Sequence, residues 1–202
     1  MARPLYVVFA GVNGAGKSTF YRTGFWREPG MPRSLARVNS DEIVVEEGGD
    51  PCSDADQIRA GREALRRIDA CLEGRKSFNQ ETTLTGRTCL KTIRRAREAG
   101  YRVVLYYIGI ASAQAAIDRI EHRVSIGGHP IDEAAVRRRW AASLRNLSHA
   151  IDLCDEVTLY DNTVEFVALA RWEGGVLSWV GNLAKHGSWL MEAVRDETIW
   201  RA

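Results

Sequence analysis

A glycine-rich stretch near the N-terminus, Gly11 to Ser18 (GVNGAGKS), matches every fixed position of the pattern G-x-x-x-x-G-K-[ST]. In this pattern the glycines let backbone N–H groups turn toward phosphate oxygens, where a larger side chain would block them. Lys17 would then reach the β- and γ-phosphates, and the Ser18 hydroxyl would ligate Mg²⁺. The stretch predicts a nucleoside-triphosphate site formed by Gly11, Asn13, Gly14, Ala15, Gly16, Lys17, Ser18 and Thr19, with Ser18 as the metal ligand.

The sequence on either side of this stretch agrees with that prediction. Residues 5–10 (LYVVFA) form a short apolar run that predicts a buried strand, and residues 18–22 can open a helix. A strand before the glycines and a helix after them is the context that the motif requires. The helix N-terminus would add its positive dipole end to the phosphate site. The alternative is a chance glycine-rich turn between strand and helix.

Asp41 follows a second predicted strand, residues 35–39. In open α/β sheets, ligands bind beyond the carboxyl ends of the strands, so this carboxylate lies where chemistry is expected. A phosphotransferase needs a base for the acceptor hydroxyl, and Asp41 is the candidate. An aspartate at this position could instead cap the helix that follows, and the sequence leaves both hypotheses open.

A polar segment, Glu81, Thr82 and Thr83, follows the third predicted strand at residues 77–80. The carboxyl ends of parallel strands meet at one edge of a sheet, so this segment is expected near Asp41. Its side chains could hydrogen-bond a polyhydroxyl acceptor. The alternative is an ordinary polar turn.

Arginines recur on two predicted helices joined by a glycine break. Arg119 and Arg123 are four residues apart and share a helix face, and Arg137, Arg138 and Arg139 open the next helix after Gly127-Gly128. Two such helices predict a lid that closes over phosphates and excludes water. The alternative is a solvated basic helix–turn–helix.

Strands and helices alternate along most of the chain. Predicted strands cover residues 5–10, 35–39, 77–80, 101–110, 156–160 and 164–172, and predicted helices cover 54–73, 86–99, 112–124 and 132–153. This alternation implies right-handed crossovers and a parallel sheet with helices on both faces. We predict an α/β fold, a three-layer P-loop NTPase (kinase-like) with a mostly parallel central sheet flanked by helices. One domain would span residues 1–202, with a C-terminal helical extension over 173–202 that contains Trp179, Trp189 and Trp200.

The long helix predicted over residues 54–73 is amphipathic. Its apolar residues at helical spacing are Ile58, Leu65, Ile68 and Leu72. We expect its arginines, Arg59, Arg62, Arg66 and Arg67, to form a solvated face.

Composition limits the classes of function. Of 202 residues, 45% are hydrophobic and 27% charged, which is ordinary for a globular domain. The net charge of +2 is too small to favour nucleic acid as a partner, although most basic residues are arginines, which bind phosphate in a bidentate fork. The cysteines and histidines lack metal-ligand spacing. Neither a membrane span of roughly eighteen apolar residues nor a signal-peptide pattern is present, so no membrane partner and a cytoplasmic location are expected.

With these residues in view, the chain resembles the zeta-toxin family, P-loop kinases whose known toxins phosphorylate UDP-N-acetylglucosamine on the amino sugar. The matching pieces are residues 11–19 (GVNGAGKST), 38–41 (VNSD), 81–84 (ETTL), 101–110 and 119–123. Their order and spacing cover residues 5–162. Further pieces within residues 127–147 and at 160–162 resemble the short bacterial branch of zeta-like proteins.

This resemblance implies catalytic roles. Asp41 would be the base that accepts the proton of the sugar hydroxyl, and Lys17 would bind the γ-phosphate of ATP or GTP. Ser18 would hold Mg²⁺. Arg123, with Arg119 close to it, would face the transferring phosphate.

On the acceptor side, the resemblance places Glu81 and Thr83 against a nucleotide sugar. The best-known toxins continue this element with an arginine for the sugar nucleotide, where the chain has Thr85. Their second lid arginine has no clear match, and His129 or one of Arg137 to Arg139 would take its place. The expected acceptor is therefore a UDP-sugar or another nucleotide-like metabolite.

A toxin of this kind would deplete a cell-wall precursor, and a protein antitoxin would be expected to block its nucleotide site. Two other functions remain open. One is a kinase for a nucleic-acid end or another metabolite; the other is a nucleotide-switched interaction protein whose lid is the switch. A polynucleotide acceptor should need a basic, aromatic-lined groove, and the near-neutral net charge argues against it.

Overall fold

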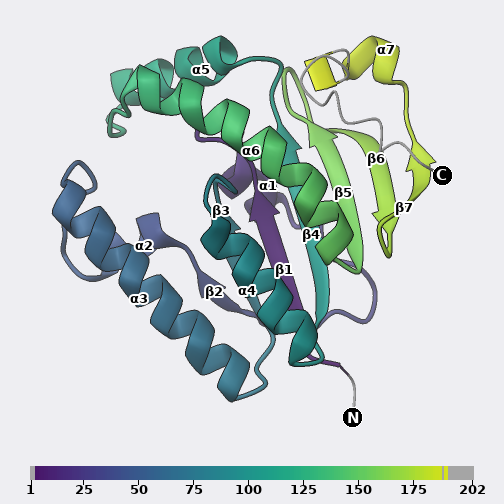
Figure 1. Cartoon of the computed structure of the whole chain (residues 1–202). Coiled ribbons are helices and arrows are strands. Elements are labelled where there is room, and N and C mark those ends of the chain that lie inside the picture. The colour runs from purple at the N-terminus through teal and green to yellow at the C-terminus, as the bar shows by residue number, and fades with distance from the viewer. Residues whose placement is uncertain (1–2, 188, 191–202) are drawn as a thin grey trace.

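The computed structural model describes residues 3–187, 189 and 190 of the chain. Within this part, seven strands form one sheet in the order β2-β3-β1-β4-β5-β6-β7 (Figure 1). The strands are β1 (Leu5–Ala10), β2 (Ala36–Val38), β3 (Phe78–Thr82), β4 (Arg102–Gly109), β5 (Glu156–Asp161), β6 (Val167–Glu173) and β7 (Val176–Val180). The pairs from β2 to β5 are parallel, and β6 and β7 continue the sheet in antiparallel fashion.

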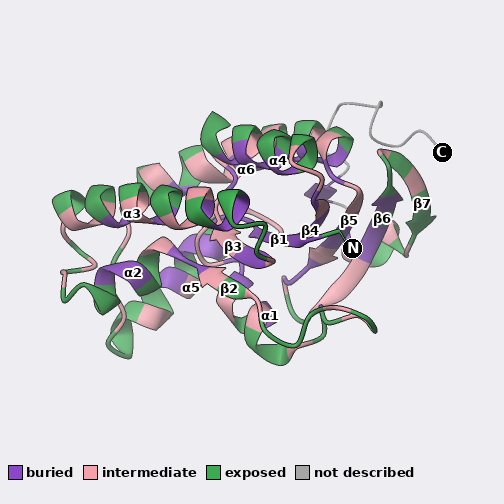
Figure 2. Cartoon of the chain, turned by 90° about the horizontal axis from the view of Figure 1, so that it is seen from below, coloured by how far each residue is buried: buried purple, intermediate pink, exposed green. Residues whose placement is uncertain are grey.

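Helices cover both faces of this sheet. They are α1 (Lys17–Thr23), α2 (Ser40–Glu46), α3 (Asp54–Glu73), α4 (Arg87–Glu98), α5 (Ala113–Ser125), α6 (Glu133–Leu153) and α7 (Leu183–His186). The layer of α3, α4 and α6 lies on one face, and α1 and α5 lie on the other (Figure 2). None of the helices that the structure describes is long and apolar enough to cross a membrane.

The central strand β1 contributes to two cores because alternate side chains point to opposite faces. Tyr6 and Val8 belong to the core under α3, α4 and α6, whereas Val7 and Phe9 belong to the core with α1 and α5. Every residue of β1 is buried, as is typical of a central strand in a parallel sheet. The predicted three-layer α/β fold with a mostly parallel sheet is confirmed.

The C-terminal part differs from the predicted helical extension. Gly174 and Gly175 both have positive φ, 58° and 83°, and they join β6 to β7 in a tight turn. Two glycines of this geometry favour a hairpin. The valines after them have high strand propensity. The sheet therefore continues through Val176–Val180, where a helix was expected.

The tryptophans of this region have different environments. Trp179 lies on the edge strand β7 and is 47% exposed. Trp189 is buried, and its indole N–H donates to the Asp161 carboxylate over 3.0 Å. Trp200 lies outside the described residues. The end of β5 is therefore tied to the segment that follows α7.

Candidate active site

The glycine-rich loop connects β1 to α1, as the sequence predicts. Gly14 and Gly16 adopt positive φ values of 81° and 96°. A Cβ atom at Gly14 would lie 2.5 Å from the carbonyl oxygen of Ala116 on α5, and one at Gly16 would lie 2.3 Å from Nδ2 of Asn162. These glycines are therefore required by the backbone conformation and by the elements packed against the loop.

Lys17, the first residue of α1, points back into this loop. Its side chain is buried, and Nζ donates to the carbonyl oxygen of Val12 over 3.1 Å. Burial lowers the pKa of Lys17, and the nearby carboxylates of Glu81 and Asp41 act in the opposite direction. A buried ammonium group whose hydrogen bond goes to a neutral carbonyl favours an anionic ligand.

A cavity of about 440 Å³ opens in front of the loop, and we call it the loop cavity. Its walls are Asn13, Gly14, Gly16, Lys17, Ser18, Thr19, Arg22, Asp41, Glu81, Arg119, Ile120, Arg123, Asn162 and Phe166. Two predicted loop residues, Gly11 and Ala15, are buried and do not line it. Ala15 instead accepts a hydrogen bond from Asn162 Nδ2 over 2.8 Å, which fixes the loop from the end of β5.

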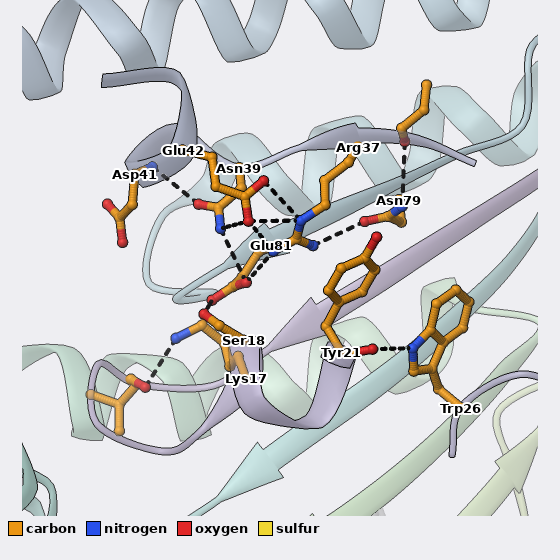
Figure 3. Close-up of polar contacts among 12 residues, drawn as sticks. Lys17, Ser18, Tyr21, Trp26, Arg37, Asn39, Asp41, Glu42, Asn79 and Glu81 are labelled. Atoms are coloured by element: carbon orange, nitrogen blue, oxygen red, sulfur yellow. Dashed lines mark hydrogen bonds and ion pairs between the residues drawn. The ribbon is translucent and has the colours of Figure 1, made fainter. Parts of the chain in front are cut away.

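Glu81 lies beside the loop because β3 pairs with β1 in a register that places it opposite Phe9. One carboxylate oxygen accepts from the Ser18 hydroxyl over 2.8 Å (Figure 3). The other accepts from Arg37 over 2.8 Å and from Asn39 over 3.2 Å. The side chain of Glu81 is only 8% exposed. This buried carboxylate is therefore compensated by an arginine and two neutral donors.

Arg37, on β2, has its guanidinium group in contact with several side chains (Figure 3). Besides Glu81 it contacts the carboxylate of Glu42 and the side-chain oxygen of Asn79. Its guanidinium lies 3.8 Å from the centre of the Tyr21 ring on α1, a cation–π contact. Burial alone would lower the pKa of Arg37, but the hydrogen bonds to Glu42 and Glu81 outweigh it and raise the pKa. No motif in the sequence marks this residue, and sequence reasoning missed it.

The helix after β2 is capped by Asn39, whose Oδ1 accepts from the backbone N–H of Asp41 over 3.0 Å. The hypothesis that Asp41 is the cap is therefore wrong. The Asp41 side chain is exposed in the first turn of α2, and its carboxylate has no hydrogen bond or ion pair with another described residue. It lines the loop cavity and is free to meet a ligand there.

A second cavity, of about 500 Å³, lies between the loop, α3 and the segment after β3, and we call it the α3 cavity. It shares Asn13, Lys17, Asp41 and Glu81 with the loop cavity. Its other walls include Asn39, Ser40, Gln57, Ile58, Gly61, Arg62, Leu65, Thr82, Thr83, Thr85, Thr88, Cys89 and Arg139. The two cavities therefore meet at Lys17 and Asp41.

Two residues of the predicted polar segment, Glu81 and Thr82, end β3 itself, and Thr83 follows it. Thr82 Oγ1 accepts from the backbone N–H of Leu84 over 3.2 Å, so this hydroxyl helps to form a turn. The hydroxyls of Thr83 and Thr85 lie 3.0 Å apart and face the α3 cavity. Thr85, where the resemblance would place an arginine, contributes only a neutral hydroxyl.

The arginines of the predicted lid separate into two groups. Arg119 and Arg123 both line the loop cavity; Arg119 donates to the Thr163 carbonyl and Arg123 to the His129 carbonyl. The Nε atom of Arg123 is buried with no hydrogen-bond partner in the described chain. Arginine side chains in the wall of this cavity are suited to donate to a phosphate oxygen.

Of the arginines that open α6, only Arg139 reaches the site. Its Nη1 donates to the Asn13 side chain over 3.0 Å, and it lines the α3 cavity. Arg137 contacts Gln114 and Glu133, and neither it nor Arg138 lines either cavity. His129, the other predicted stand-in for the second lid arginine, lines neither cavity, and its backbone carbonyl accepts the hydrogen bond from Arg123.

The fold and this site define a P-loop protein with a kinase-like three-layer fold. The sequence profile of the Zeta toxin family matches residues 1–168, and the chain belongs to that family. An uncharacterized protein of Haemophilus influenzae is 32% identical over 134 residues, which cover 66% of this chain and 91% of the relative.

Solved structures share the fold at low sequence identity. The structure of the PezAT chromosomal toxin–antitoxin system of Streptococcus pneumoniae superposes with a TM-score of 0.60 at 17% identity, covering 83% of this chain and 72% of that one. The AvrRxo1-ORF1:ORF2 complex with ATP gives a TM-score of 0.63 at 18% identity, covering 91% and 62%. The Pnkp1/Rnl/Hen1 RNA repair complex gives 0.58 at 18% identity, covering 73% and 46%.

The first prediction concerns the pair formed by Arg37 and Glu81. Arg37→Met leaves the Glu81 carboxylate without its arginine in a buried setting, so the free energy of unfolding should fall by about 3–5 kcal/mol. Urea denaturation measures it. In the double variant Arg37→Met/Glu81→Met, much of that loss should be recovered, because no carboxylate is left buried without its arginine.

The matched control is Arg95→Met, which removes an arginine from an exposed ion pair with Asp69. Its cost should stay below about 1 kcal/mol. Equal losses of unfolding free energy for Arg37→Met and Arg95→Met would show that the buried pair contributes no more to stability than an exposed one.

Proposed function

We propose that the protein is a small-molecule kinase that transfers the γ-phosphate of ATP or GTP to a hydroxyl of a UDP-activated sugar such as UDP-N-acetylglucosamine. The observation that carries this proposal is the meeting of the two cavities at Lys17 and Asp41. A triphosphate in the loop cavity would place its γ-phosphate beside Lys17, and an acceptor in the α3 cavity would approach from the other side.

The transfer needs a base, and Asp41 suits that role because its carboxylate is exposed and unpaired among the described residues. The acceptor oxygen would bond to the γ-phosphorus while the bond from that phosphorus to the β–γ bridging oxygen breaks. The nucleoside diphosphate leaves, and Asp41 takes the hydroxyl proton. Lys17, Arg119 and Arg123 would face the negative charge on the moving phosphoryl group.

The side chains at the loop also suit Mg²⁺, which prefers oxygen ligands and binds through few protein groups plus phosphates. The Ser18 hydroxyl and the Glu81 carboxylate lie 2.8 Å apart next to Lys17, and these two residues would hold the ion. When bound, Mg²⁺ supplies charge neutralisation at the β- and γ-phosphates.

The acceptor proposal rests on the zeta-toxin resemblance and on the walls of the α3 cavity. Hydroxyls of Thr83 and Thr85 and the amide of Gln57 could bind a polyhydroxyl sugar near Asp41. Glu81 already accepts hydrogen bonds from Ser18, Arg37 and Asn39. It would contact the sugar only through a lone pair that these three bonds leave unused.

A protein antitoxin is proposed as the partner, in line with the toxin–antitoxin system among the structural neighbours. An antitoxin that covers the loop cavity would prevent nucleotide binding. We further propose that the protein acts in the cytoplasm, where ATP and nucleotide sugars are available as substrates.

Replacing the proposed base tests the mechanism. Asp41→Asn keeps the size of the side chain and removes its basicity, so kcat should fall about 10²–10⁴-fold while nucleotide affinity stays nearly unchanged. Phosphorylated product can be measured by mass spectrometry with ATP, Mg²⁺ and a panel of UDP-sugars, with a 5′-hydroxyl RNA as a further acceptor.

The control is Asp69→Asn, a half-exposed aspartate that contacts Arg95 and lines neither cavity. It should retain full activity. A wild-type rate for Asp41→Asn would remove Asp41 from the mechanism, and product formed only with RNA would replace the proposed acceptor.

The lid arginines offer a second test with a matched pair. Arg123→Gln removes a guanidinium that faces the loop cavity, so kcat should fall about 10²–10³-fold, as for other lost transition-state donors. Arg137→Gln alters an arginine of the lid that lies outside both cavities and should leave kcat within a factor of two. Equal effects of the two changes on steady-state rates would contradict the assignment of Arg123.

A further inference from the structure

The arginines of α3 differ in what they contact. Arg59 contacts Asp56 and Glu47, and both Arg66 and Arg67 contact Glu63. These three behave as the predicted solvated face. Arg62 is also exposed, but it has no ion pair or hydrogen bond with any described residue, and it lines the α3 cavity.

Arg62 belongs to a face of α3 that looks into this cavity. Ile58, Gly61, Arg62 and Leu65 recur at the spacing of one helix face, and all four line the cavity. Ile58 is 57% exposed and Leu65 38%, although the sequence pattern grouped both with Ile68 and Leu72, which are buried. We call these four residues the α3 face.

Space for a ligand exists directly above this face. A Cβ atom at Gly61 would have no heavy atom of another element within 4 Å, so the middle of the face is open. The exposed aliphatic side chains of Ile58 and Leu65 flank this opening along the helix. Such a surface suits a flat apolar group, with the Arg62 guanidinium available beside it.

The charges of the cavity also favour an anion. Arg139, on another wall, donates to the neutral side chain of Asn13 and has no carboxylate partner in the described chain. Of the two carboxylates in the wall, Glu81 is paired with Arg37. The other, Asp41, forms no ion pair with a described residue, so Arg62 and Arg139 are not paired with either carboxylate. An arginine without an ion pair can bind phosphate in a bidentate fork.

We infer that the α3 face binds the nucleotide part of the acceptor, with Arg62 on its phosphate and Ile58 and Leu65 against its ring. This inference rests on the proposed function, in which the acceptor occupies the α3 cavity. Arg62 would then determine specificity for the acceptor. It would supply a charged contact that Thr85 cannot provide, because the Thr85 side chain is neutral.

Binding and kinetics together test the inference. With a non-hydrolysable ATP analogue and Mg²⁺ filling the loop cavity, calorimetry measures the affinity of UDP-N-acetylglucosamine. Arg62→Gln should weaken this affinity tenfold or more, and the acceptor KM should rise in parallel. The KM for ATP and the saturated kcat should stay within a factor of two, because Arg62 does not line the loop cavity.

Arg66→Gln is the matched control, since Arg66 lies one turn further along α3 and contacts Glu63. It should bind the acceptor as the wild type does. Binding of N-acetylglucosamine 1-phosphate, which has a phosphate but no uracil ring, should be weakened by Arg62→Gln and unchanged by Leu65→Ser. UDP-N-acetylglucosamine should be sensitive to both changes.

Gly61→Leu tests the face without removing any contact. The position is open and helical, so thermal unfolding should occur at or above the wild-type temperature. The new side chain should nevertheless block the acceptor, raising its KM at least tenfold. A Gly61→Leu protein that binds acceptor normally would overturn the inference.

The outcomes separate this inference from the kinase proposal. If Arg62→Gln lowers acceptor affinity but no variant or wild type forms product, the α3 face stands and the kinase proposal fails. If product forms and Arg62→Gln has the wild-type acceptor KM, the kinase proposal stands and the α3 face fails. Absence of binding by both UDP-N-acetylglucosamine and UDP would also overturn the α3 face.

Discussion

The buried carboxylate of Glu81 is the contact on which the arrangement of the site depends. One of its oxygens accepts from Ser18 in the phosphate loop, and the other accepts from Asn39. Asn39 in turn caps α2 through the backbone N–H of Asp41. Glu81 therefore fixes the proposed base relative to the loop, and Arg37 offsets the charge that this position buries.

The parts of the site that the sequence predicts are those set by local chemistry. The loop is marked by glycines, Lys17 and Ser18 at fixed spacing, so its conformation between β1 and α1 could be predicted from the residues alone. The position of Asp41 beyond β2 follows from the rule that parallel strands end at one edge. Its alternative role as a cap was decided only by the structure, because Asn39 competes for that position.

Residues that depend on contacts between distant segments could not be predicted in this way. Arg37 meets Glu81, 44 residues later, only because β2 and β3 pair, and no local pattern signals that pairing. Arg62 shares the helical spacing of a solvated face, and only the placement of α3 over the cavity distinguishes it from Arg66. The hairpin of β6 and β7, by contrast, has a local signal in its Gly174-Gly175 turn, and the predicted C-terminal helix was wrong there.

In the proposed mechanism, a phosphate bound by the loop faces an acceptor held against α3, and transfer occurs where the two cavities meet. A crystal structure with Mg²⁺, a non-hydrolysable ATP analogue and UDP-N-acetylglucosamine tests this most directly. The γ-phosphate should lie at Lys17, and the reacting hydroxyl should lie within about 3 Å of the Asp41 carboxylate on the opposite side of the phosphorus. An acceptor bound outside the α3 cavity, or an Asp41 carboxylate turned away from its hydroxyl, would contradict the account.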